Sequence, residues 1–120
     1  MSAPQVVPSV IYHVCEATAW QAAAALGLYR GSADDQRDGF IHFSARHQVE
    51  ESVARHRAGQ TGLVLLDVAT GPLSADLKWE PSRGGDLFPH LYAALPCAAV
   101  RRVRPLPLGP DGRHRFPLLD

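Results

Sequence analysis

The chain has 120 residues, of which 46% are hydrophobic, and this suits one ordinary domain that buries about two thirds of its unfolded surface. Its 12 basic and 12 acidic residues cancel, so it lacks the excess of Lys and Arg on which non-specific nucleic-acid binding depends. The longest apolar run is too short to cross a bilayer, and residues 1–10 lack the basic and apolar regions of a signal peptide. We therefore expect a cytoplasmic protein with no membrane contact.

The first part of the chain predicts a strand, a helix and a polar loop. Residues 10–15 (VIYHVC) are β-branched or aromatic, which is typical of a strand. Thr18 and Gln21 form a capping-box pattern before an alanine-rich segment, which predicts a helix that ends at Gly27. Residues 30–38 predict a loop whose acidic side chains are expected to be solvated turn formers: Asp34, Asp35 and Asp38.

The middle of the chain predicts a strand, a second helix and a central strand. Residues 39–43 (GFIHF) predict a short strand, and Ser44 after it is a natural N-cap for a helix over residues 45–58. Residues 61–68 (TGLVLLDV) are almost continuously apolar, which is typical of a strand buried on both faces.

The second half predicts further short strands. Residues 77–80 favour a strand, and residues 81–86 (PSRGGD) a loop. Residues 87–95 are compatible with a turn, a strand or a helix, and residues 99–104 alternate as in a half-exposed strand. The Pro-rich and Gly-rich tail, residues 105–120, predicts irregular packing. No repeat or linker divides the chain, so we expect one α+β domain over residues 1–120, with two helices in its N-terminal half.

Three histidines are candidates for chemistry because each lies among apolar residues. Strand alternation places His13 and His42 on the faces opposite their apolar neighbours, so each faces a cleft or solvent. His90 lies between a proline and a leucine. One alternative is that the three are structural and merely hydrogen-bonded. A zinc site is a further alternative, but no closely spaced pair of ligands supports it, so no metal is expected. The other histidines lie among charged residues and are expected at the surface: His47, His56 and His114.

The segment of residues 79–92 (WEPSRGGDLFPHLY) holds the densest group of candidate ligand-binding residues. Arg83 beside Gly84 and Gly85 would place a cation next to accessible backbone N–H groups, which suits a phosphate or another anion. The alternative is an ordinary surface turn. Trp79 would stack on a ligand ring or belong to the core, and Glu80 would act as a base or pair with Arg83.

Ser44 and the two cysteines complete the candidates. Ser44 would cap its helix, and the N–H groups there could also contact an anion. Cys15 and Cys97 form no CxxC motif, so we expect two reduced, buried thiols.

Several tracts together resemble the DUF952 family of small bacterial proteins. They are IYH at 11–13, WQ at 20–21, YRGS at 29–32, DGFIHFS at 38–44, WEPSRGG at 79–85, LFPHLY at 87–92 and FP at 116–117. The resemblance covers about residues 10–118, and the family brings no established biochemical function with it.

The resemblance implies the ADP-ribosyltransferase fold, a mixed α+β split sheet that holds NAD in a cleft. Three motif positions line the cleft in that superfamily, and His13, His42 and His90 match or fall near them. Transferases of this fold often carry Glu at the third position, where this chain has His90, and a small residue after the first histidine, where it has Val14. RNA phosphotransferases of the same broad fold also lack the Glu and depend on His and Arg.

The functional expectation is therefore a His-lined cleft for NAD or a related nucleotide or phosphate ligand, with ADP-ribosyl or phosphoryl-type transfer. The catalytic candidates are His13, His42 and His90. The ligand-binding candidates are Tyr12, Ser44, Trp79, Glu80, Arg83, Gly84, Gly85 and Tyr92. The alternatives are a catalytically silent small-ligand module and a protein-interaction module whose histidines are structural.

Overall fold

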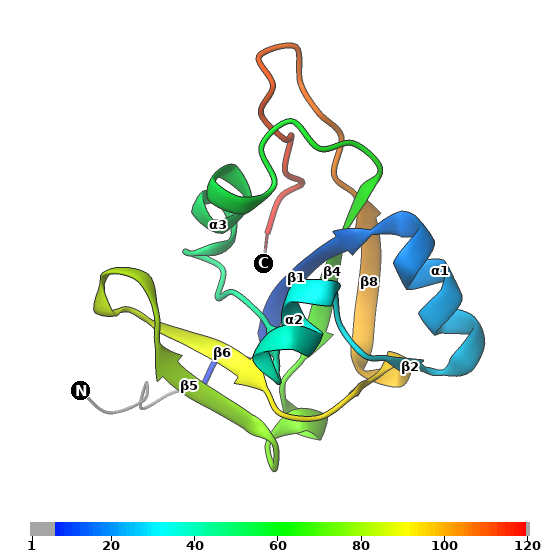
Figure 1. Cartoon of the computed structure of the whole chain (residues 1–120), viewed down its shortest axis with the longest axis vertical. Helices are drawn as coiled ribbons and strands as arrows, with labels where there is room; N and C mark the ends of the chain where they lie inside the picture. The colour runs from blue at the N-terminus through cyan, green and yellow to red at the C-terminus, as the bar shows by residue number, and fades with distance from the viewer. Residues whose placement is uncertain (1–6, 120) are drawn as a thin grey trace.

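The computed structural model describes residues 7–119, apart from the side chain of Arg83. Within these residues, three α-helices accompany two three-stranded antiparallel sheets and one two-stranded ladder (Figure 1). The expectation of a mixed α+β fold is confirmed.

The first sheet has the order β1-β4-β8. β1 (Val10–Glu16) and β8 (Val100–Pro105) flank β4 (Leu63–Ala69), and both pair with it antiparallel. β4 is almost wholly buried, as its apolar sequence predicts for a central strand. In the β1–β4 register, His13 pairs with Leu66.

The second sheet has the order β3-β6-β5 and carries the other two candidate histidines. β6 (Leu87–Leu91) lies between β3 (Ile41–His42) and β5 (Leu77–Pro81), so the segment that the sequence left open begins as a strand. His42 pairs directly with His90 in the β3–β6 register. β2 (Leu28–Tyr29) pairs with β7 (Leu95–Pro96) in the short ladder.

The two sheets meet at a bridge between Tyr12 and Ser44. The Tyr12 N–H donates to the Ser44 carbonyl at 2.9 Å, and the Ser44 N–H donates to the Tyr12 carbonyl at 2.8 Å. This bridge brings the end of β3 against the middle of β1, and so brings His42 close to His13.

The helices differ from the sequence predictions mainly at their starts. α1 (Ala17–Leu26) has Glu16 at its N-cap without a side-chain cap, so the predicted Thr18 capping box is wrong, whereas Gly27 ends the helix as expected. α3 (Val49–His56) has Gln48 at its N-cap, so the predicted helix of residues 45–58 is too long and Ser44 does not cap it. Ser44 instead serves as a bridge residue between the sheets.

A short helix replaces part of the predicted loop. α2 (Ala33–Asp38) begins at Ser32, whose side chain accepts from the Asp35 N–H while the Asp35 carboxylate accepts from the Ser32 N–H. This reciprocal capping box satisfies two N–H groups of a helix that is too short to be stable by propensity alone. Short 3₁₀ segments lie at Gly71–Leu73, Arg83–Gly85 and Cys97–Ala99.

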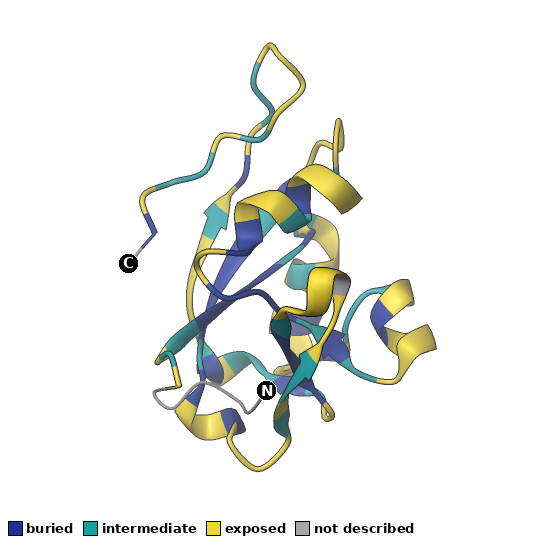
Figure 2. Cartoon of the chain, turned by 90° about the vertical axis from the view of Figure 1, so that its left-hand side faces the viewer, coloured by how far each residue is buried: buried dark blue, intermediate teal, exposed yellow. Residues whose placement is uncertain are grey.

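Buried residues concentrate on the central strands, drawn dark blue in Figure 2. The core consists of two clusters, which lie on the two faces of the first sheet. One cluster contains Ile11 and Leu66 from this sheet together with Leu91 from the second sheet. The other contains Tyr12 and Leu65, and α3 packs its apolar face against them. Both faces of β1 are therefore covered, and this is why His13 is only 5% exposed even though strand alternation separates it from Tyr12.

Cys15 and Cys97 form no disulfide. Cys15 is buried and Cys97 is half-buried. Burial raises the pKa of Cys15 to about 11, so this thiol stays protonated at neutral pH. No helix within residues 7–119 has the length and apolar character needed to cross a membrane.

Candidate functional site

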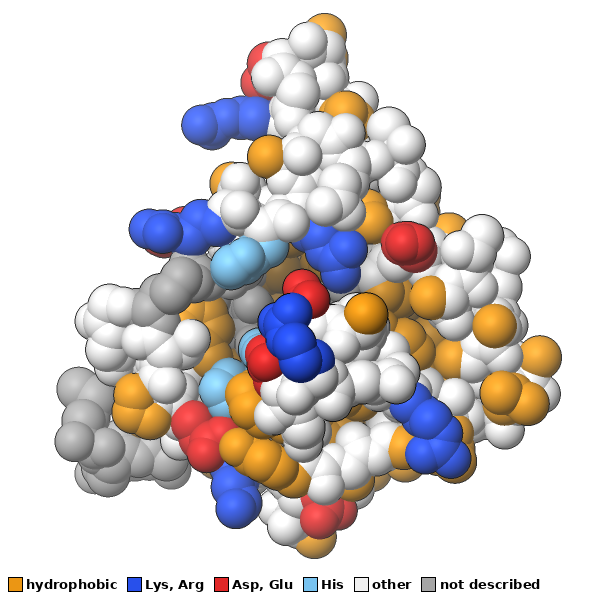
Figure 3. Space-filling view, viewed as in Figure 1, with side chains coloured by type: hydrophobic (Ala, Val, Ile, Leu, Met, Phe, Trp, Pro, Cys, Tyr) orange, Lys and Arg blue, Asp and Glu red, His pale blue; other side chains and the backbone are white. Residues whose placement is uncertain are grey.

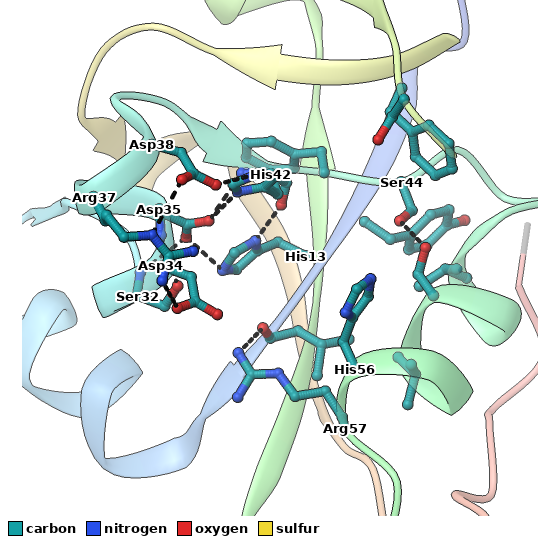
Figure 4. A pocket seen from close by; sticks show the side chains of 18 residues that line it. His13, Ser32, Asp34, Asp35, Arg37, Asp38, His42, Ser44, His56 and Arg57 are labelled. Carbon is teal, nitrogen blue, oxygen red and sulfur yellow. Dashed lines mark hydrogen bonds and ion pairs between the residues drawn. The ribbon is translucent and has the colours of Figure 1, made fainter. Parts of the chain in front are cut away.

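A cavity of about 320 Å³ opens between α2 and α3, above β1 and beside the bridge that joins the sheets. Histidine side chains gather around a hollow in the face shown in Figure 3, with acidic and basic side chains at its rim. In the closer view, His13, Asp35 and His42 lie on one side of this cavity, and Ser44 lies on the other (Figure 4). We call this cavity the histidine cleft.

The shortest polar contact in the histidine cleft joins His42 to Asp35. His42 Nδ1 lies 2.6 Å from Asp35 Oδ1, and His42 Nε2 lies 3.1 Å from Asp38 Oδ2. The hydrogen bond to Asp35, together with the nearby carboxylates, raises the pKa of His42 even though partial burial opposes the charge. With a carboxylate at each ring nitrogen, the imidazolium is the favoured form.

Asp35 is the organising carboxylate of the histidine cleft. It is 3% exposed, so the expectation of a solvated turn former is wrong for this residue. Its Oδ1 accepts from both the ring and the N–H of His42, and its Oδ2 accepts from the Ser32 N–H. Burial opposes ionisation, but the hydrogen bonds from His42 and Ser32 hold the pKa of Asp35 below its ordinary value. Asp34 and Asp38 are exposed, as expected, and also line the cleft.

His13 is neutral in this arrangement. Burial lowers its pKa more than Asp35 raises it. Its Nδ1 lies 2.6 Å from the His42 carbonyl, which only accepts, so Nδ1 carries the proton. Nε2 then accepts from the Tyr29 hydroxyl at 2.8 Å. His13 and His42 are thus linked through one carbonyl group, but their surroundings shift their pKa values in opposite directions.

The opposite wall of the histidine cleft comes from α3. Spacing of three and four residues puts Val49, Ser52, Val53 and His56 on one helix face, and all four line the cavity. Ser44 Oγ lies 3.3 Å from Ser52 Oγ.

At the end of α3, Arg57 Nη2 donates to the Val14 carbonyl at 3.4 Å, so a cation also reaches the floor of the cleft. The histidine cleft therefore combines an apolar wall, a carboxylate–imidazolium wall and this guanidinium.

His90 does not line this cavity, although it lies next to it. Its ring stacks on Phe40 with centroids 4.1 Å apart and meets the His42 ring edge-on at 5.5 Å. His90 Nδ1 lies 2.8 Å from Glu80 Oε1, which also accepts from the Tyr92 hydroxyl at 2.7 Å. Burial lowers the pKa of His90, while the hydrogen bond from Tyr92 lowers that of Glu80. His90, Glu80 and Tyr92 therefore form a polar cluster next to Phe40, separate from the histidine cleft.

The remaining candidates are dispersed. Tyr12 and Ser44 line the histidine cleft and are buried. Trp79 packs against the core and lines a different cavity, and Gly84 lines another small one. Gly84 and Gly85 both adopt positive φ, as a tight turn requires. The side chain of Arg83 lies outside the part that the structure describes.

Sequence reasoning missed several side chains that line the histidine cleft. Ser52 and Arg57 were not singled out, and His56 was assigned to the surface; it is exposed, yet it also borders the cavity. The available signal was the helical spacing of Ser52 and His56 from Val49 and Val53. Within residues 7–119, no group of three or more His, Cys, Asp or Glu side chains is arranged to hold a metal ion.

Comparisons with known proteins point to one family. A family model described as "Protein of unknown function (DUF952)" matches residues 14–103. The crystal structure of protein CC0527 from Caulobacter crescentus is 48% identical, covers 88% of this chain and 93% of that one, and superposes with a TM-score of 0.85. The solution structure of the same protein is 48% identical over 88% and 91% of the two chains, with a TM-score of 0.79. No curated protein matches the chain.

Proposed function

The chain belongs to the DUF952 family, and we propose that its histidine cleft binds the ribosyl end of NAD or a related nucleotide in a fold of the ADP-ribosyltransferase type. The observation that carries the proposal is the position of His13, Asp35 and His42 in one cleft beside the bridge that joins the two sheets. In a split-sheet fold, a ligand enters at such a point because strand ends and loops from both sheets converge there.

The size of the histidine cleft limits what it can hold. Ligand pockets span roughly 300–1,000 Å³. At about 320 Å³ this cavity lies at the lower end, so it suits one ring and one sugar rather than a whole dinucleotide. The apolar wall, with Val49, Val53 and Phe88, would cover the ring. The polar wall, with His42 and Asp35, would hydrogen-bond the sugar hydroxyls, and Arg57 would balance a phosphate.

The chemistry of the proposed transfer uses His42 and its two carboxylates. When the ligand displaces Asp38 from His42 Nε2, the protonated imidazole, held by Asp35 at Nδ1, can donate to a ribose oxygen or a phosphate and stabilise negative charge there. In ADP-ribosyl transfer, the glycosidic bond breaks and its electron pair leaves with nicotinamide, while the acceptor loses a proton as it bonds to the ribose. Asp38, exposed at the rim beside His42 Nε2, is the carboxylate placed to take that proton.

A catalytically silent binding module is the second candidate, and one observation favours it. Both ring nitrogens of His13 and both of His42 already contact protein groups. In addition, the Val14 carbonyl, next to the first motif position, accepts from Arg57. A cleft in this state can hold a ligand by shape and charge without moving protons.

A titration of the isotope-labelled full chain separates the candidates. Amide spectra are recorded with NAD, nicotinamide, ADP-ribose and inorganic phosphate, for the wild type, His42→Gln and the control His114→Gln. His114 does not line the histidine cleft. We expect shifts at Val14, Ser44 and Ser52 with NAD. His42→Gln should weaken binding about tenfold, the size of one charge-assisted hydrogen bond, and His114→Gln should not.

The outcome then decides between transfer and silent binding. Release of nicotinamide from NAD, measured by chromatography and lost in His42→Gln, would support a transferase. Binding without release would support the silent module. Equal affinities of the two variants, or shifts confined to residues outside the histidine cleft, would refute the proposed site.

A further inference from the structure

A second and larger cavity lies on a different part of the molecule from the histidine cleft. Its volume is about 850 Å³, and the two cavities share no lining residue. The start of β1, the turn after Ser44, the middle of β5 and the start of β8 form its walls. Four basic side chains and one tryptophan line it: Arg46, His47, Arg101, Arg102 and Trp79.

An irregularity in β8 places two consecutive arginines in this cavity. In the β4–β8 register, Asp67 pairs with Arg102 but Val68 pairs with Val100, so Arg101 is an extra residue in β8. Consecutive residues of a regular strand point to opposite faces, whereas a bulge redirects the side chain of the extra residue. As a result, Arg101 and Arg102 line the same cavity. Bulges of this kind are frequent next to binding sites.

The cavity carries an excess of positive charge. Asp67 is 2% exposed and is the acidic residue in the wall. It is already paired with Arg104 at 2.7 and 3.0 Å and with Arg102 at 3.2 Å. Within residues 7–119, the structure shows no ion pair or hydrogen bond for the side chains of Arg46 and Arg101. The buried carboxylate therefore does not neutralise these two arginines, and their guanidinium groups are available to a ligand.

Trp79 adds an aromatic surface to this basic cavity. Its side chain is half-buried, with one part packed against the core and another part lining the cavity. An indole held in this way is a rigid platform on which a planar ring can stack. Arginines suit phosphate because the planar guanidinium can donate two parallel hydrogen bonds to its oxygens. A phosphate and a flat ring on one small molecule would therefore satisfy both features.

We propose that this basic cavity is a second ligand site, which binds a free nucleoside phosphate with its base on Trp79 and its phosphates at Arg46 and Arg101. The volume lies within the range of small-molecule pockets, roughly 300–1,000 Å³. The site is distinct from the proposed NAD cleft, because no residue lines both cavities, although β1 contributes residues to each.

The test uses the two tryptophans of the full chain as reporters. Spectra of the indole N–H groups are recorded with ATP, adenosine and inorganic pyrophosphate at low salt. Trp79 should shift with ATP, while Trp20, which does not line the cavity, should stay unchanged. Adenosine should bind much more weakly than ATP, because it lacks the phosphates. Added salt should weaken ATP binding by screening the arginines.

Two variants and a matched control locate the site. Arg101→Gln and Arg46→Gln should each weaken ATP binding about tenfold, the value of one charge-assisted contact. Arg30→Gln removes the same charge from an exposed position outside the cavity and should leave the affinity unchanged. His42→Gln should also leave the Trp79 shift unchanged, which separates this site from the histidine cleft.

Several results would overturn the proposal. Pyrophosphate that binds as tightly as ATP without moving Trp79 would show an anion site with no place for a base. A single-stranded oligonucleotide that binds far more tightly than ATP would show a nucleic-acid surface instead. Absence of any Trp79 shift at millimolar ATP, or equal weakening by Arg30→Gln, would rule out a defined nucleotide site.

Discussion

At the residue scale, one buried carboxylate sets the charge of the histidine cleft. Asp35 accepts hydrogen bonds from Ser32 and from both the backbone and the ring of His42. It therefore stabilises the imidazolium of His42, whereas His13, bonded to a carbonyl and a hydroxyl, stays neutral. Two histidines in one cleft whose pKa values shift in opposite directions can take different roles, one as a cation or proton donor and one as a fixed polar contact.

The titration of the three histidines should follow from these contacts. The pKa of His42 should lie above the ordinary value of 6.5, and those of His13 and His90 below it. For His42 the folded state holds the proton more tightly, so its contribution to stability is complete below pH 6.5 and is lost as the pH rises through its raised pKa. For His13 and His90 the sign is opposite, and stability falls as the pH drops through their lowered pKa values. Ring-proton NMR from acid to alkaline pH measures all three.

Asp35→Asn provides the control for that titration. It removes the negative charge but keeps the size of the side chain, so the pKa of His42 should fall toward or below 6.5. Asp34→Asn, at an exposed residue of the same helix, should move it much less. A His42 pKa that is unchanged in Asp35→Asn would contradict the contact.

At the element scale, α2 is the helix that the sequence analysis did not predict. Its residues, ADDQRD, contain no apolar periodicity, and runs of Asp and Gly usually form turns. The signal was the Ser32–Asp35 spacing, a capping box with Asp in place of the usual Glu or Gln. Apolar strands such as β4 could be predicted because a continuous run of apolar residues indicates a buried strand. The six-residue helix α2 could not be predicted in this way, because its cap and its tertiary contacts hold it in place.

The cap of α2 should matter more than the one that the Thr18 pattern suggested for α1. Ser32→Ala removes the hydroxyl that accepts from the Asp35 N–H and should cost about 1 kcal/mol of unfolding free energy. The Ser32 backbone N–H still donates to the Asp35 carboxylate in this variant, so the raised pKa of His42 should be retained. Thr18→Ala, at an exposed residue that caps nothing, should change stability by less than about 0.5 kcal/mol. Urea denaturation of both variants measures the difference, and equal costs would refute the assignment of the caps.

At the scale of the whole molecule, long-range pairing creates the histidine cleft. His13 and His42 are 29 residues apart and meet because Tyr12 and Ser44 bridge the two sheets. The family resemblance predicted that three histidines would gather. The structure places His13 and His42 in the cleft and His90 behind Phe40, in contact with the His42 ring. Strand composition alone cannot give this result, because neither the pairing of β3 with β6 nor the bridge from Ser44 to β1 is encoded in any local pattern.

The C-terminal tail should stabilise α3, the helix that forms the apolar wall of the histidine cleft. Leu106 is 1% exposed and shares a core cluster with Val49 and Val53, whose helix forms the apolar wall of the cleft. Leu106→Ala should therefore cost about 3 kcal/mol of unfolding free energy, as is usual for a buried leucine, and should loosen α3. Leu118 is 86% exposed, so Leu118→Ala should cost less than about 0.5 kcal/mol. Urea denaturation measures both costs, and hydrogen exchange at Val53 should rise only in Leu106→Ala. Equal exchange in the two variants would mean that the tail does not support this wall.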